Sequence, residues 1–185
     1  MKQLFEPVVF VEHKPLVWDY KIYTDDYYKG YYHWHQCCEI MFVHGGQGNV
    51  VVNQQMYDIR RGMLFFFQPY QLHRIYSEVS PACPFERSIF YIDPHVAENL
   101  LVGFSKRKAL FTTLWRGENT HCAINLEDRV EIVEWTLEQY DHNKKKQSKR
   151  KYRRHFDVNP SIIEQYQDWR SADIPIRRTA DLALF

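Results

Sequence analysis

Apolar and polar residues alternate in short runs over the first half of the chain, and this pattern predicts β-strands. The runs end at turn signals such as the glycines at 45, 46 and 48 and the pair Asn53-Gln54. Several strands at this spacing are typical of an antiparallel sandwich or barrel. The strand candidates are residues 8–14, 33–44, 49–52, 56–59, 63–67, 73–79 and 85–92.

Helical signals replace the strand signals after residue 92. Asp93 followed by Pro94 predicts a helix start and a short helix over 95–104, because an aspartate caps a helix and proline fits its first position. Residues 121–126 form another strand candidate, and a helix over 126–143 follows, capped by Asn125. Its apolar residues, spaced by 4, 3, 4 and 3, form one stripe: Leu126, Val130, Val133, Leu137 and Tyr140. The stripe fits packing on the barrel and packing in a homodimer equally well.

The net charge of +1 hides an uneven distribution. Residues 144–154 hold eight of the 24 basic residues and no acid, so the rest of the chain has 16 basic and 23 acidic residues, a net charge of −7 (16 − 23). A basic run of this kind is typical of a solvated linker, although it also suits non-specific phosphate binding. We therefore expect a barrel over 1–125, the helix over 126–143, and a basic, poorly ordered linker and tail over 144–185.

Membrane and redox functions find little support in the sequence. No apolar run approaches the ~20 residues of a membrane span, and the N-terminus lacks the apolar core of a signal peptide, so we expect a cytoplasmic protein without a membrane partner. No two cysteines show the C-x-x-C spacing of zinc knuckles and thioredoxin-like centres. We interpret all four as buried small hydrophobes: Cys37, Cys38, Cys83 and Cys122.

Three histidines and a glutamate are the candidate chemistry. His33, His35 and Glu39 are odd-numbered and would share one face of a strand. Glu39 lies about 13 Å from His35 along an ideal strand, so it converges on the histidines only if the strand bends strongly. His73 begins a return strand that would lie across from them. Imidazole and carboxylate donors suit divalent zinc, iron, manganese or nickel, and the alternative is a hydrogen-bonded polar core.

The order of these residues resembles the two motifs of the cupin superfamily. Gly30, the H-x-H pair, Glu39 and Gly45 or Gly46 follow the first motif, and Gly62 and His73 follow the second. The second motif departs from the family at Gln68, where proline is usual, and at Tyr70, where glycine is usual. The resemblance implies a mainly β, cupin-like double-stranded β-barrel (jelly roll) followed by C-terminal helices. It also implies four metal ligands: His33, His35, Glu39 and His73.

A narrower resemblance covers residues 8–140. The phrase "HWHQCCEIMFVHGGQG", a later "FERSIFYI" strand, the Asp-Pro helix and the amphipathic helix resemble the effector-binding and dimerisation domain of AraC-type transcription regulators. The resemblance implies a small polar effector such as a sugar, a homodimer formed through the helix stripe, and DNA contact through a C-terminal helix-turn-helix domain. We expect the effector to contact the four candidate ligands together with Tyr31, Tyr57 and Arg74, three side chains that could line the cavity but are equally usual at the mouth of a barrel.

Two function classes remain open at this point. The first is a sensor without catalytic residues, with or without a metal in its barrel. The second is a stand-alone metal-dependent cupin enzyme, a dioxygenase or a sugar isomerase. Two helix-turn-helix units need about 100 residues, and 29 follow Phe156 (185 − 156), so we expect no complete DNA-binding domain in this chain.

Overall fold

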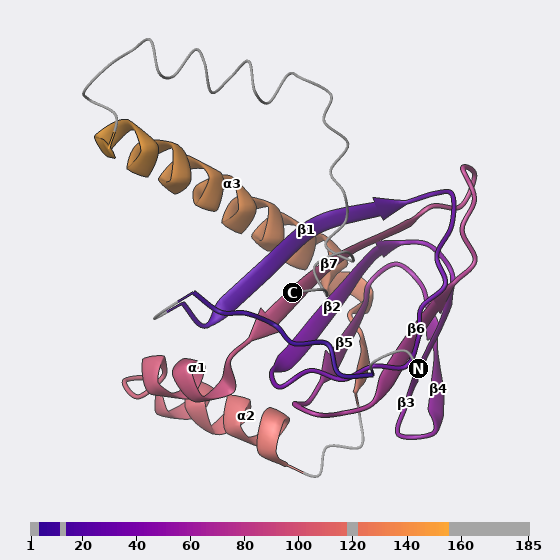
Figure 1. The fold of residues 1–185 in the computed structure, drawn as a ribbon, viewed down its shortest axis with the longest axis horizontal. Coiled ribbons are helices and arrows are strands. Elements are labelled where there is room, and N and C mark those ends of the chain that lie inside the picture. Colours follow the sequence, from indigo (N-terminus) through magenta and orange to yellow (C-terminus); the bar gives the residue numbers. More distant parts are fainter. Residues whose placement is uncertain (1–3, 12–13, 118–121, 156–185) are drawn as a thin grey trace, which may run out of the picture. The chain divides into compact units, whose positions relative to one another are not determined.

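Two antiparallel sheets form the body of the protein in the computed structural model, which describes residues 4–11, 14–117 and 122–155 (Figure 1). The first sheet contains, in order, β1 (Leu16–Thr24), β7 (Phe85–Ile92), β2 (Cys38–Gly45), β5 (Met63–Phe67) and β8 (Ala123–Asn125). The second contains β4 (Gln55–Ile59), β3 (Gly48–Val52) and β6 (His73–Ser77). The predicted fold class, a mainly β barrel followed by helices, is confirmed.

One hydrophobic core joins the two sheets. Met41 and Phe65 come from the first sheet, Val50 and Ile75 come from the second, and all four belong to the same buried cluster. Alternate residues of each strand enter this core, because successive side chains of a strand point to opposite faces. The same alternation brings selected polar residues of β2 and β6 to the inner side.

The predicted strands are correct in the centre of the chain and wrong near its start. Residues 8–11 lie outside any strand, and the first strand starts only at Leu16. Val9 is 83% exposed and Val11 is 66% exposed, so this apolar run faces no core. The strand predicted over 33–44 starts only at Cys38, because the chain bends at residues 36–37.

The predicted tight turn at Asn53-Gln54 is confirmed. Both residues have positive φ angles, 50° and 62°, and they connect β3 directly to β4. Two-residue hairpins favour this left-handed backbone because it matches the twist of the flanking strands. The turn thereby fixes the register of β3 and β4, in which Val52 pairs with Gln55.

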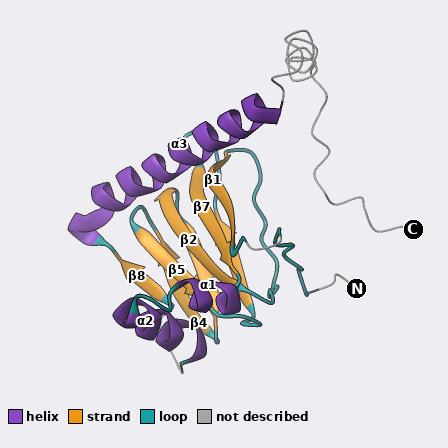
Figure 2. Cartoon of the chain, turned by 90° about the vertical axis from the view of Figure 1, so that its left-hand side faces the viewer, coloured by secondary structure: helices purple, strands orange, loops and turns teal. Residues whose placement is uncertain are grey.

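Two short helices follow β7 and pack against each other (Figure 2). α1 (Pro94–Leu100) is capped by Asp93 as predicted, but it ends before residue 104. α2 (Ser105–Arg116) was not predicted, and none of its residues is fully buried. Glu98 of α1 accepts hydrogen bonds from Trp115 and Arg116 of α2, which holds the pair together.

The last helix begins and ends at other residues than the predicted 126–143. A short 3-10 helix, η1 (Glu127–Arg129), comes first, and α3 runs over Val130–His155. The predicted cap is wrong: α3 starts at Val130, five residues after Asn125, and the N-cap of η1 is Leu126, although Asn125 accepts a hydrogen bond from the backbone N–H of Glu127. The first part of the predicted linker is helical, and residues 156–185 lie outside the described residues.

Contacts divide the chain into two compact units, 1–137 and 138–185. In the first unit, the start of α3 is held by polar contacts: His44 Nδ1 lies 3.5 Å from Glu134, and Arg61 donates to Glu134 at 2.7 Å. The same His44 contacts Ser88 of β7 through its Nε2 at 2.8 Å. β2 therefore connects the start of α3 with the neighbouring strand.

Candidate metal and effector site

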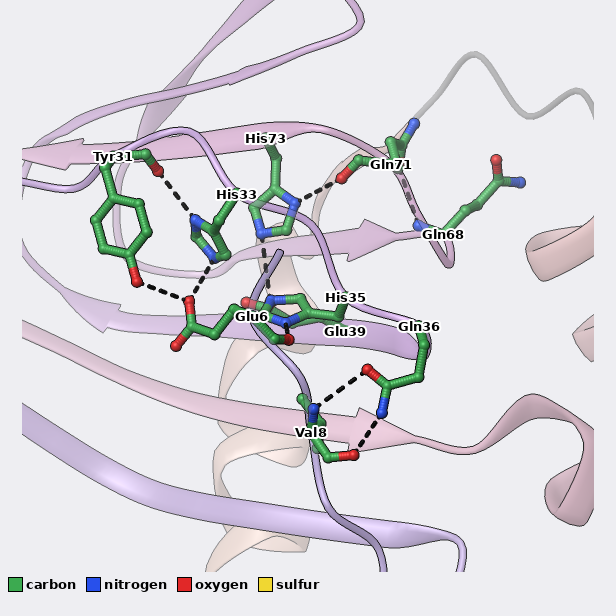
Figure 3. A network of polar contacts seen from close by, with 10 residues as sticks. All are labelled: Glu6, Val8, Tyr31, His33, His35, Gln36, Glu39, Gln68, Gln71 and His73. Atoms are coloured by element: carbon green, nitrogen blue, oxygen red, sulfur yellow. Dashed lines mark hydrogen bonds and ion pairs between the residues drawn. The ribbon is translucent and has the colours of Figure 1, made fainter. Parts of the chain in front are cut away.

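Four of the predicted site residues meet where the two sheets join (Figure 3). His33 and His35 lie in the segment before β2, Glu39 is the second residue of β2, and His73 is the first residue of β6. His33 and His73 pair through two backbone hydrogen bonds of 3.0 Å. This isolated bridge, with the bend at residues 36–37, brings Glu39 to the histidines.

The four side chains converge closely. Glu39 Oε2 lies 2.9 Å from His35 Nε2 and 3.4 Å from His73 Nε2. One donor atom from each of the four residues lies within 4.8 Å of the others. His35, Glu39 and His73 are buried, whereas the His33 side chain keeps 14% of its surface exposed. The structure therefore brings together all four predicted metal ligands, with one side open at His33.

In each of the three imidazoles, Nδ1 forms a hydrogen bond of 2.9 Å with a backbone carbonyl oxygen. The acceptors are Tyr31 O for His33, Glu6 O for His35 and Gln71 O for His73. A carbonyl oxygen only accepts, so each Nδ1 donates, and in a neutral ring the Nε2 keeps its lone pair.

The lone pairs face a carboxylate, and this arrangement demands a positive charge. His35 Nε2, His73 Nε2 and Glu39 Oε2 are buried and form no hydrogen bond while both imidazoles are neutral. Two acceptors 2.9 Å apart repel each other unless a proton or a metal ion lies between them. The cluster therefore needs either a proton or a metal ion between these atoms.

The pKa values of Glu39 and the histidines show how their charges affect one another. Burial alone would raise the pKa of Glu39, but hydrogen bonds from His35 and His73 and their charges lower this pKa to about 2. Burial lowers the pKa of His35, but the hydrogen bond and charge of Glu39 outweigh it and raise the pKa. Burial and the charge of His73 lower the pKa of His33. These directions favour a carboxylate at Glu39 and a protonated imidazole at His35.

The donor set fits a divalent transition metal. Three imidazole nitrogens and one carboxylate oxygen suit zinc, iron, manganese or nickel. Two donors bound to one ion at about 2.1 Å lie at most about 4.2 Å apart, so donors within 4.8 Å need only a small contraction. The carbonyls that hold each Nδ1 are the outer-shell partners that orient histidine ligands.

The other predicted effector contacts lie at different places. The Tyr31 ring centroid lies 5.2 Å from that of His33, at the cluster. Tyr57 lies on β4, with its ring against the hydrophobic core. Arg74 lies on the opposite face of β6 from His73, and its guanidinium is 5.7 Å from the Tyr32 ring centroid. The structure therefore joins only Tyr31 of these three to the cluster.

Three residues of the site were missed from the sequence. Phe67 stacks on His73 with ring centroids 4.0 Å apart, and the Tyr91 ring lies 5.1 Å from that of His35. Tyr91 pairs with Glu39 where β2 and β7 lie side by side. The sequence could have indicated Tyr91 only if the register of these two strands had been known. Glu6 contacts two of the histidines and lies 29 residues before His35 (35 − 6), with no motif around it.

The cysteines take no part in the cluster. Cys37, Cys38 and Cys122 are buried, as predicted, and Cys83 is half-buried. Burial raises the pKa of Cys37 and that of Cys38 to about 12, so both thiols stay protonated at neutral pH. Cys37 lies outside the group of converging donor atoms and is a packed side chain beside the site.

The predicted apolar stripe lies on α3. Its residue Val130 is buried against Gly62 of the same compact unit. Leu126, Val133 and Leu137 are half-buried, whereas Tyr140 is 43% exposed. Two apolar side chains outside the stripe are more exposed: Ile132 at 63% and Trp135 at 60%. Val130 thus supports the alternative in which the helix packs on the barrel.

Comparison with known proteins relates residues 20–131 to the family model described as AraC-like ligand binding domain. ToxT from Vibrio cholerae aligns over 67% of this chain and 48% of its own, about half its length, with 10% identity and a TM-score of 0.45. A cupin protein from Bacteroides fragilis aligns over 43% of this chain and 67% of its own, with 16% identity and a TM-score of 0.36.

A putative mannose-6-phosphate isomerase from Ralstonia eutropha aligns over 42% of this chain and 70% of its own, with 12% identity and a TM-score of 0.32. No curated protein matches the sequence significantly. None of the helices in the described part of the chain has the length and apolar character that a membrane crossing requires.

Proposed function

The chain belongs to the family of AraC-like ligand binding domains, and on this premise we propose that it is the effector-sensing part of a cytoplasmic transcription regulator. The effector is a small polar molecule of the sugar class, bound at the cluster of His33, His35, Glu39 and His73. No catalytic role is assigned to these residues.

One observation supports this assignment above all. The three Nε2 lone pairs and the Glu39 carboxylate converge around a point that requires a cation. We propose that the four residues hold a divalent zinc, iron, manganese or nickel ion. A bound ion would supply a Lewis acid that fixes a hydroxyl or carbonyl oxygen of the effector.

Metal analysis of the purified full chain tests this proposal. We expect a transition metal in the unaltered protein and its loss in His33→Ala. Glu78→Gln, at an exposed position beyond the far end of β6, is the matched control and should keep the metal. Absence of a bound transition metal from the unaltered protein would contradict the metal part of the proposal.

Thermal unfolding with a panel of sugars tests the effector. A ligand at 100 times its dissociation constant stabilises the folded state by about 2.7 kcal/mol. We expect the active sugar to raise the unfolding temperature of the unaltered protein and to leave that of Glu39→Gln unchanged. A sugar that stabilises both proteins equally binds elsewhere.

A metal-dependent cupin enzyme, a dioxygenase or a sugar isomerase, is the alternative, because the complete set of four ligands also suits catalysis. Family membership favours the sensor. Product formation by the metal-loaded protein, abolished in Glu39→Gln, would establish the enzyme.

Signal transmission completes the proposal. The sensor forms a homodimer through α3, and the effector shifts the population between two dimer states. DNA contact is assigned to a helix-turn-helix domain that the described residues do not include.

A further inference from the structure

The N-terminal residues 4–8 lie beside the segment that carries the histidines (Figure 3). Glu6 N donates to Trp34 O, and Trp34 N donates to Leu4 O, both at 3.0 Å. Two residues further on, the Val8 backbone pairs in both directions with the Gln36 side-chain amide. The backbone is therefore fixed on both sides of Glu6.

Glu6 contacts two of the three imidazoles in different ways. Its backbone oxygen accepts from His35 Nδ1 at 2.9 Å. Its carboxylate Oε2 lies 3.7 Å from His33 Nε2 and accepts a hydrogen bond from the Tyr31 hydroxyl at 3.0 Å. This carboxylate thus stands at the one donor of the cluster that remains partly exposed, since His35, Glu39 and His73 are buried.

The distance fits coordination of a common ion. Two donors that bind one metal at about 2.1 Å can be up to about 4.2 Å apart, and Oε2 of Glu6 is 3.7 Å from the His33 donor atom. We propose that Glu6 is a fifth metal ligand, supplied by the N-terminal segment. This inference rests on the metal site proposed above.

A second carboxylate changes the charge of the site and its preference among metal ions. Two carboxylates balance the charge of a divalent ion, and a donor set with two oxygens shifts preference towards metals that accept five or six ligands, such as iron and manganese. Glu6 also takes the position on the exposed side. An effector that binds the metal directly therefore either displaces this carboxylate or takes the sixth position of a six-coordinate ion.

A structural role for Glu6 makes a different prediction. In that role the residue only accepts from Tyr31 and His35, and a glutamine could accept the same hydrogen bonds. Glu6→Gln preserves the volume and the backbone but removes the anionic donor. It therefore separates a ligand from a hydrogen-bond acceptor.

Cobalt(II) titration of the metal-free full chain, followed by visible absorption, tests the proposal. Compared with the unaltered protein, we expect Glu6→Gln to bind cobalt at least about tenfold more weakly, since even outer-shell changes cost 10–100-fold in metal affinity. Its absorption per cobalt should be stronger, as is typical of four-coordinate cobalt. Glu78→Gln carries the same charge change at an exposed position and should match the unaltered protein in both readouts.

The outcomes separate this inference from the metal site itself. Unchanged cobalt affinity and spectrum in Glu6→Gln would overturn the inference and leave the four-ligand site standing. A lower unfolding temperature of metal-free Glu6→Gln with unchanged cobalt binding would assign Glu6 a structural role and also overturn it. If the unaltered protein binds no cobalt, the metal site and the fifth ligand both fail.

Discussion

Glu39 has the most perturbed environment of the ligand cluster. Burial would raise its pKa, but His35 and His73 lower it to about 2 from an ordinary value of 4.5. A carboxyl group with a depressed pKa adds stability above its unfolded pKa, and this stability is lost as the pH falls through the folded pKa. The loss should therefore fall between about pH 4.5 and pH 2.

The expected size of this effect is about 3 kcal/mol, because each pKa unit corresponds to about 1.4 kcal/mol. We expect urea denaturation of the metal-free protein to show falling stability over this pH range, and a flatter profile for Glu39→Gln. Glu78→Gln removes a carboxylate at an exposed position outside the cluster, so it is the control that should keep the fall. Equal slopes for the unaltered protein and Glu39→Gln would show that Glu39 is not held as a carboxylate.

Tyr70 stands where the cupin motif usually has glycine, and its backbone shows why glycine is usual there. Its φ is 61°, in the left-handed region, and its N–H donates to His35 O. A residue with a Cβ pays roughly 1–2 kcal/mol for this conformation. The side chain is 67% exposed and contributes little burial in return.

We expect Tyr70→Gly to be more stable than Tyr70→Ala by about 1 kcal/mol, since only glycine adopts this φ without strain. Chemical denaturation of the two variants measures the difference directly. If the alanine variant is equal or better, the backbone at Tyr70 is not strained in solution.

At the scale of elements, the start of α3 depends on a glycine in the turn before β5. Gly62 has a φ of 83°, and a Cβ added there would lie 2.4 Å from Val130 Cγ2. Gly62→Ala should therefore lower the free energy of unfolding by about 1–3 kcal/mol. Most of this loss comes from two sources, backbone strain and the contact with Val130.

A double-mutant cycle separates the two sources. In the Val130→Ala background the steric contact is gone, so Gly62→Ala should cost less by at least about 0.5 kcal/mol. Equal costs in both backgrounds would mean that Gly62 serves the turn alone and that α3 packs elsewhere in solution.

The sequence predicts elements best where a local signal determines them. Asn53-Gln54 and Asp93-Pro94 are local signals, and both positions match the structure. α2 was missed because its apolar stripe is short: only Phe111, Leu114 and Trp115 recur at helical spacing, and they are half-buried. The run at 8–11 consists of β-branched and aromatic residues as a strand does, but no neighbouring strand pairs with it in the described residues.

The residues of the candidate site also fall into two groups, those that a sequence motif indicates and those that only the folded structure brings to the site. The H-x-H pair, Glu39 and His73 follow a motif whose spacing is visible in the sequence. Glu6 reaches the site through backbone pairing with Trp34, a long-range contact that no local pattern encodes. The face of Arg74 was mispredicted for a simpler reason: it follows His73 directly on β6, and neighbouring residues of a strand point to opposite sides.

At the scale of the whole molecule, dimerisation requires apolar surface that the barrel leaves free. Val130 is buried within its own unit, so the predicted stripe is not free along its whole length. Ile132 and Trp135 are three residues apart on α3, share a helix face and are both more than half exposed. We therefore expect these two residues to contribute to the homodimer contact, in addition to the exposed end of the stripe at Tyr140.

Sedimentation velocity over a range of protein concentrations tests this prediction. The unaltered chain should sediment as a dimer, and the double variant Ile132→Ala, Trp135→Ala should sediment as a monomer. Its stability as a folded unit should change by no more than about 0.5 kcal/mol, because exposed side chains contribute little to folding. A matched double variant on α2, Phe104→Ala with Leu110→Ala, also removes two exposed apolar side chains and should remain a dimer. If the α2 variant dissociates equally, the dimer depends on general surface hydrophobicity; if the α3 variant stays dimeric, the contact lies away from Ile132 and Trp135.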